Sequence, residues 1–191
     1  MIPEFNQSGV LPPFLPGESP TRHAGMAPYK TSIVDLVLRY AHSPERRAIL
    51  QGLLDYRKQL RMLGISDGFQ WIDGSFVEDI EANRSRPPAD IDLVTFACRP
   101  VDHNDDSNWS QLIYHNQDVF IPKEAQRKYQ CDAYFVDLDL DPKHVVDMTR
   151  YWFGLFSHQR DSYLWKGMLE VPLNCDDDNA FDILSRETAN A

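Results

Sequence analysis

The apolar residues between positions 32 and 64 recur with the spacing of two helices. Ser32, with Asp35 three residues later, predicts an N-cap. Ser43 followed by Pro44 predicts a second helix start, and Gly64 predicts where that helix ends. Each helix then has one apolar face that packs on a core: Ile33, Leu36, Val37 and Tyr40 in the first, and Ile49, Leu53, Tyr56, Leu60 and Leu63 in the second.

Beyond residue 68 the pattern changes to short apolar runs bounded by polar residues, which is typical of strands. Strands are predicted over 69–73, 90–96, 131–138 and 167–173. The alternation with helices predicts the α/β (α+β) class, in which helices flank a mixed sheet within one domain, residues 31–191. The helices expected between the strands are one over 76–83, one around Trp109, Leu112 and Ile113 capped by Ser107 or Asn108, and one capped by Asp141 with Val145, Met148, Trp152, Leu155 and Phe156 on its apolar face.

The two ends of the chain lack this periodicity. Prolines at positions 3, 12, 13, 16, 20 and 28 argue against a regular helix or a central strand in residues 1–30. We expect an extended Pro-rich arm that packs on its own domain through apolar residues such as Phe5 and Leu11, with a partner-binding arm as the alternative. The acidic run at 174–179 predicts a solvated loop.

Composition narrows the class of protein. The hydrophobic content of 42% and the charged content of 25% are ordinary for a globular chain of 191 residues. A formal net charge of −10 disfavours a broad nucleic-acid-binding surface, because such binding depends on neutralising phosphates. No apolar run is long enough to span a membrane. Three widely spaced cysteines indicate reduced thiols, so we expect a cytoplasmic protein.

Two carboxylates lie at the N-terminal end of the second predicted strand. Asp90 and Asp92 are two residues apart, so in a strand both side chains project from the same face. Oxygen ligands so placed suit a hard cation such as Mg²⁺. A third carboxylate would let two ions sit about 3.5–4 Å apart, the arrangement used for displacement at phosphorus. We expect Asp132 to be that ligand, since it opens its strand as Asp90 does, with Asp137 as the rival on the opposite face.

Gly74 and Ser75 follow the first predicted strand. A strand that ends in Gly-Ser and enters a helix leaves backbone N–H groups free for phosphate oxygens. Glycine lets a phosphate approach the backbone, and the serine hydroxyl adds a donor. Lys166, in the loop before the last strand, either reaches a phosphate too or is only solvated.

A Gly-Ser turn, a spacer, Asp-hydrophobic-Asp and a third strand aspartate together resemble the nucleotidyltransferase fold shared with DNA polymerase beta. The resemblance covers residues 69–138 and rests on Gly74, Ser75, Asp90, Asp92 and Asp132. It implies that the turn holds the phosphates of a nucleoside triphosphate such as ATP, and that the carboxylates hold Mg²⁺ or Mn²⁺. Fourteen residues separate Ser75 from Asp90, a long spacer that a loop over 84–88 would absorb.

The resemblance also implies a reaction and a setting. A nucleoside monophosphate would be transferred to a hydroxyl acceptor on a protein, an RNA end or a small molecule, and the acidic surface favours protein or small molecule over RNA. The chain is similar as well to short bacterial proteins with the same Pro-rich start, G-S-F-V, D-I-D-L-V and D-A-Y-F-V. Small stand-alone members of the superfamily often belong to toxin–antitoxin or phage-defence systems.

Other functions are compatible with parts of this pattern. A catalytically idle relative would act as a binding or regulatory subunit through a protein partner. An Asp-x-Asp glycosyltransferase would not need the Gly-Ser turn. The cluster of Lys123, Arg127 and Lys128 is either a solvated helix face or a phosphate or acceptor site. Tyr151 and Trp152 are expected in the core rather than in a base-stacking surface.

Overall fold

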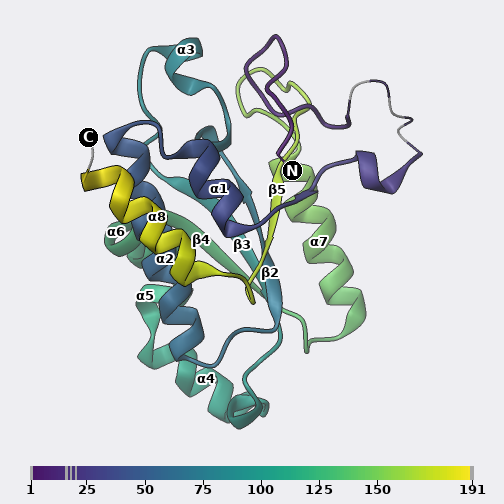
Figure 1. The fold of residues 1–191 in the computed structure, drawn as a ribbon. Coiled ribbons are helices and arrows are strands. Elements are labelled where there is room, and N and C mark those ends of the chain that lie inside the picture. The colour runs from purple at the N-terminus through teal and green to yellow at the C-terminus, as the bar shows by residue number, and fades with distance from the viewer. Residues whose placement is uncertain (1, 16, 18, 20, 190–191) are drawn as a thin grey trace.

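A computed structural model describes residues 2–15, 17, 19 and 21–189 (Figure 1). Its centre is a five-stranded mixed sheet in the order β1-β5-β2-β3-β4. β2 is antiparallel to both of its neighbours, whereas β1 pairs with β5, and β3 with β4, in parallel. The predicted mixed α/β architecture is therefore confirmed. The strands are β1 (Tyr29–Lys30), β2 (Gly68–Asp73), β3 (Ile91–Ala97), β4 (Cys131–Asp137) and β5 (Leu169–Pro172).

Helices cover both faces of the sheet. α7 lies on one face, and α1, α2 and α8 lie on the other (Figure 1). Among the described residues there are eight α-helices: α1 (Ile33–Tyr40), α2 (Pro44–Met62), α3 (Ile80–Arg84), α4 (Asp106–His115), α5 (Gln117–Phe120), α6 (Pro122–Tyr129), α7 (Pro142–Phe156) and α8 (Asp177–Ala189). None of them is long and apolar enough to cross a membrane.

Most predicted helix starts are confirmed by their caps. The Ser32 hydroxyl accepts the Asp35 N–H at 2.9 Å, and the Ser43 hydroxyl accepts the Arg46 N–H at 3.2 Å. Asp141 caps α7 as expected. The cap of α4 was predicted wrongly, because Asp105, rather than Ser107 or Asn108, accepts the first free N–H groups of the helix.

The predicted helix over 76–83 is confirmed only in its second half. The chain forms a 3₁₀ turn at Ser75–Val77, becomes extended at Glu78, and only then enters α3. The N-terminal arm is the reason. Val10 forms an isolated antiparallel bridge with Glu78, and the Asp79 N–H donates to the Gly9 carbonyl at 2.8 Å. The arm thus holds this segment in an extended conformation between two short helical pieces.

The arm is laid along the domain. Val10 and Leu11 are fully buried, and the Leu11 carbonyl accepts the Gly167 N–H at 2.8 Å. Tyr29 and Lys30 join the sheet as β1, which the proline pattern did not predict. Pro16 and Pro20, which contributed to that pattern, lie outside the described residues.

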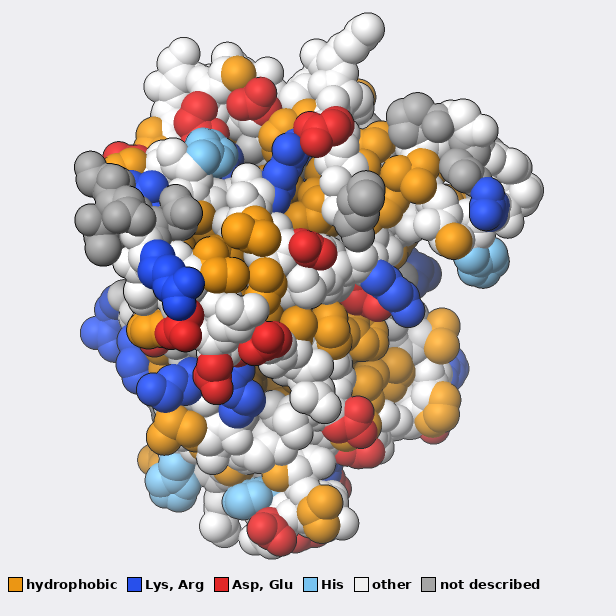
Figure 2. All heavy atoms as spheres, viewed as in Figure 1, with side chains coloured by type: hydrophobic (Ala, Val, Ile, Leu, Met, Phe, Trp, Pro, Cys, Tyr) orange, Lys and Arg blue, Asp and Glu red, His pale blue; other side chains and the backbone are white. Residues whose placement is uncertain are grey.

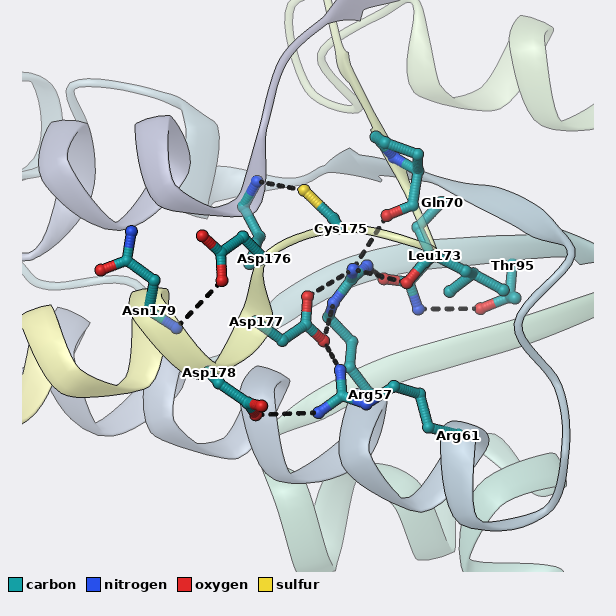
Figure 3. Close-up of polar contacts among 12 residues, drawn as sticks. Arg57, Arg61, Gln70, Thr95, Leu173, Cys175, Asp176, Asp177, Asp178 and Asn179 are labelled. Atoms are coloured by element: carbon teal, nitrogen blue, oxygen red, sulfur yellow. Dashed lines mark hydrogen bonds and ion pairs between the residues drawn. The ribbon is translucent and has the colours of Figure 1, made fainter.

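The predicted solvated loop at 174–179 is wrong, because α8 begins within it at a buried aspartate (Figure 3). Arg57 of α2 donates to both carboxylate oxygens of Asp177, at 3.0 and 2.8 Å, and to Oε1 of Gln70 on β2 at 2.7 Å. Arg61 donates to the same carboxylate. An acidic run usually indicates a solvated segment, but here two arginines neutralise its one buried member.

The face of the sheet that α7 covers has its own hydrophobic cluster, which shows which side chains of each strand point toward α7. Trp71, Val94 and Val136 from three neighbouring strands pack there with Trp152 and Phe156 of α7. Because side chains alternate along a strand, residues two or four positions away point to the same side. On the face drawn in Figure 2, positive and negative side chains are interspersed rather than gathered into a basic surface.

Candidate active site

Three aspartates form a row across neighbouring strands. Asp73 at the end of β2 pairs in register with Asp92 of β3, and Asp92 pairs with Asp132 of β4. Asp73 has the parity of Trp71, and Asp92 that of Val94, so their side chains project toward the α7 side of the sheet. Asp90 lies just before β3. Sheet pairing therefore brings two of the predicted carboxylates, Asp92 and Asp132, to the same end of the sheet as Asp73.

The Gly74–Ser75 turn lies against this row. Gly74 has φ +78° and ψ −165°, a conformation that favours glycine. A Cβ built at Gly74 would lie 1.7 Å from Oδ2 of Asp92. Any other residue would be strained in this backbone conformation and would have to displace the Asp92 carboxylate, so the position favours glycine. The 3₁₀ turn that starts at Ser75 takes the place of the first half of the helix expected from the sequence.

The carboxylates repel one another. Burial, followed by the charges of Asp90 and Asp132, raises the pKa of Asp92 to about 6. Burial and the Asp90 carboxylate also raise the pKa of Asp132. Neither Asp92 nor Asp132 has an ion-pair partner within the described part of the chain. A bound cation would relieve this repulsion.

Lys166 is buried beside the turn, with 3% of its side chain exposed, so a merely solvated loop lysine is excluded. Its Nζ lies 3.0 Å from Asp73 Oδ1, 2.8 Å from Glu78 Oε1 and 3.4 Å from the Gly74 carbonyl oxygen. Burial opposes the charged ammonium, but the two carboxylates outweigh it and raise the pKa of Lys166. For Asp73, burial outweighs the attraction of Lys166 and raises its pKa to about 7.

These residues line one cleft of about 730 Å³. It brings together all six residues predicted from the sequence: Gly74, Ser75, Asp90, Asp92, Asp132 and Lys166. It also contains residues that the sequence analysis missed, namely Asp73, Glu78, Gln126 and Arg160. Asp73 could have been identified from the sequence, since it directly precedes Gly74. Nothing in the sequence identifies Gln126, because its contact with Asp90 depends on how α6 packs.

The residues considered as alternatives lie elsewhere. Asp137 is at the far end of β4, where its carboxylate accepts from Arg99 Nε at 2.6 Å, so Asp132 and not Asp137 lies beside Asp92. Arg127 and Lys128 pair with Glu124 and Asp118 on the surface, away from the cleft.

The expectation of a buried aromatic group is confirmed only in part. Trp152 is in the core as predicted, with 5% exposed. Tyr151 is 52% exposed, so the prediction that it is buried is wrong.

The oxygen donors suit a divalent cation, although they are not arranged as a complete coordination sphere. No group of three or more His, Cys, Asp or Glu side chains forms a ready metal-binding set among the described residues. The Asp90 carboxylate accepts from the side-chain amide of Gln126, and its charge acts on Asp92. The fit therefore rests on the chemistry of the donors, which are oxygen ligands with raised pKa values and no cationic partner on Asp92 or Asp132.

The model of a family of unknown function, DUF6932, matches residues 3–172, which include every residue of the candidate site. No curated protein and no solved structure matches the chain.

Proposed function

We propose that this protein, which belongs to the DUF6932 family of unknown function, is a divalent-cation-dependent nucleotidyltransferase. One observation carries the proposal: the register of three strands places Asp73, Asp92 and Asp132 in a row, with the Gly74–Ser75 turn against Asp92. A glycine turn beside unpaired carboxylates suits a triphosphate that arrives with its own cations.

Asp90, Asp92 and Asp132 are the residues that would hold Mg²⁺ or Mn²⁺. The metal would neutralise the triphosphate and polarise the bond that breaks. Asp90 accepts from Gln126 through Oδ2, one of its two carboxylate oxygens, so Oδ1 would remain for a metal. Relief of the carboxylate repulsion would favour metal binding.

Other residues of the cleft would position the substrate. The backbone at Gly74 and the Ser75 hydroxyl would hold the terminal phosphates of the triphosphate. Lys166, between Asp73 and Glu78, fixes both sides of that turn. The oxygen of the acceptor hydroxyl would bond to the α-phosphorus as pyrophosphate leaves, and Asp132 would accept the proton of that hydroxyl. Such catalysis depends on positioning and charge rather than on a covalent nucleophile.

The setting of this activity is proposed from the resemblance alone. A small stand-alone nucleotidyltransferase in the cytoplasm fits a toxin–antitoxin or phage-defence system. An Asp-x-Asp glycosyltransferase fits less well, because it gives no reason for the close approach of Gly74 to Asp92.

The test is transfer from α-labelled nucleoside triphosphates in Mg²⁺ or Mn²⁺, with cell extract as the source of acceptor. We expect release of pyrophosphate and transfer of the label. Asp92→Asn should abolish both, since it removes the central ligand. Asp147→Asn is the control, because Asp147 is exposed on α7 and lies outside the cleft. If the unmodified protein neither binds nor cleaves any nucleotide, a catalytically idle binding subunit is the better account.

A further inference from the structure

A hairpin over residues 158–165 connects α7 to β5 and lines the cleft. An antiparallel bridge joins its two ends, and the Gln159 N–H donates to the Leu164 carbonyl at 2.9 Å. The Gln159 side chain donates at 2.8 Å to the carboxylate of Glu78, which also accepts from Lys166. The hairpin is therefore fixed by its own bonds and tied to the buried ion pair beside the candidate site.

Arg160 is an exposed cation at the tip of this hairpin, and it lines the cleft. The other Lys and Arg side chains of the cleft are already paired: Lys166 lies between two carboxylates, and Arg84 pairs with Asp161 at 3.2 Å. Within the described part of the chain, the Arg160 side chain makes no hydrogen bond or ion pair. Its guanidinium is therefore available to an anion in the cleft.

The charge of Arg160 reaches the carboxylates of the candidate metal site. Burial raises the pKa of Asp92 and Asp132 most strongly, and the positive charge of Arg160 opposes that rise at both. Lys166 contacts the Gly74 carbonyl oxygen, whereas Arg160 acts as far as Asp132, at the opposite end of the row. Divalent cations bound by these carboxylates would repel the guanidinium unless an anion lay between them. A phosphate near Asp132 meets this requirement.

Tyr163 presents an aromatic ring from the same hairpin. It lines the cleft, and 82% of it is exposed. Its φ of +55° lies in the left-handed region, which a bulky side chain rarely adopts. Such an exposed ring contributes little to the core, and backbone strain of this kind is concentrated at ligand sites. An aromatic face in a cleft that suits a triphosphate is chemically matched to a nucleobase, which stacks on it.

We propose that the tip of this hairpin is the second holding point of the nucleotide, where Arg160 bonds to the α-phosphate and Tyr163 stacks on the base. This inference rests on the proposed nucleotidyl transfer and deepens it. The planar guanidinium can donate to two oxygens of one phosphate, and its charge would stabilise that group during transfer. Because Gly74 and Ser75 would hold the terminal phosphates, the two holding points span the whole substrate.

The experiment measures two dissociation constants by calorimetry for the full-length protein in Mg²⁺. One ligand is an ATP analogue with a methylene group between its α and β phosphorus atoms, and the other is inorganic tripolyphosphate, which has no base. Arg160→Gln should weaken both ligands by about tenfold or more, since it removes charge-assisted hydrogen bonds.

Substitution of Tyr163 separates the base from the phosphates. Tyr163→Asn keeps a residue that tolerates the left-handed conformation, and it should weaken only the ATP analogue, by about tenfold. Tyr163→Phe keeps the aromatic face, so both affinities should stay within about twofold of the unmodified protein. A merely structural role of Tyr163 would instead change both ligands together.

The controls are Arg150→Gln and Tyr114→Ala, which alter exposed residues outside the cleft and should change neither affinity. Unchanged affinities in folded Arg160→Gln would overturn the phosphate contact. Unchanged affinity for the ATP analogue in Tyr163→Asn, or an equal loss of both ligands, would overturn the stacking.

Two further variants keep the test decisive if a substitution prevents folding. Arg160→Lys keeps the charge without the paired donors, and Tyr163→Gly adopts the left-handed conformation without strain. Each should weaken the ATP analogue, and unchanged affinity in either would overturn the corresponding contact. Failure of the unmodified protein to bind the ATP analogue contradicts the nucleotidyltransferase assignment itself, so the two failures are distinct.

Discussion

At the scale of single residues, the candidate site combines two kinds of carboxylate. Asp73 and Glu78 share the ammonium of Lys166. Asp92 and Asp132 have no such partner within the described residues, although both are partly buried. A partly buried carboxylate without an ion-pair partner destabilises the folded state, and at Asp92 and Asp132 the neighbouring positive charges offset this only in part, so a bound cation would stabilise the pair.

Removing the charge of Asp92 should therefore stabilise the metal-free protein. The folded-state pKa of Asp92, about 6, lies above the value of roughly 3.9 expected in the unfolded chain. Its contribution to stability is full below about pH 4 and is lost as the pH rises through 6. At pH 8 in a chelator, Asp92→Asn should exceed the unmodified protein by about 1–2 kcal/mol in free energy of unfolding.

Urea denaturation at pH 8 and at pH 4.5 measures this effect. The difference between the two proteins should shrink at the lower pH, where Asp92 is protonated in the folded state. Mg²⁺ should stabilise only the unmodified protein. A variant less stable than the unmodified protein at pH 8 would show that Asp92 has a structural partner.

Lys166 should behave in the opposite way. Lys166→Met leaves the carboxylates of Asp73 and Glu78 buried without a counter-charge, which should lower the free energy of unfolding by about 3 kcal/mol. Adding Asp73→Asn and Glu78→Gln should restore much of the loss. Chemical denaturation of the single, double and triple variants measures the coupling. An additive result would mean that the three groups do not act as a unit.

At the scale of elements, the arm and the cleft are connected. The Gly9 carbonyl bonds to Asp79, next to Glu78, and the Leu11 carbonyl bonds to Gly167, next to Lys166. The arm therefore spans the two segments that supply the buried ion pair. By bonding to both segments the arm holds Glu78 and Lys166 in place. This is a more specific role than the packing expected from its prolines and apolar residues.

Gly167→Ala tests that support. The added Cβ would lie 2.4 Å from the Pro12 carbonyl oxygen and 2.9 Å from the Tyr29 ring, so the arm must move. We expect a loss of about 1–3 kcal/mol, as for other overpacked sites, together with faster chymotrypsin cleavage before residue 15. Gly154→Ala is the matched control, since its added Cβ meets nothing within 4 Å. Unchanged cleavage in Gly167→Ala would mean that the arm tolerates the displacement.

At the scale of the molecule, local patterns predicted the helices and strands that have clear caps and periodicity. The row of aspartates was predicted only in part. Strand alternation places Asp90 and Asp92 together, but Asp73 joins them only through the antiparallel register of β2 with β3. No local pattern encodes that register. α8 was missed for a similar reason, because the partner of Asp177 is 120 residues away in sequence.

The most direct test of the central claim is a crystal structure with Mn²⁺ and a non-hydrolysable triphosphate whose α and β phosphorus atoms are bridged by a methylene group. We expect anomalous density for Mn²⁺ among Asp90, Asp92 and Asp132, with the terminal phosphates on Gly74 and Ser75. Metal and nucleotide bound elsewhere, or the absence of both from the crystal, would contradict the nucleotidyltransferase assignment.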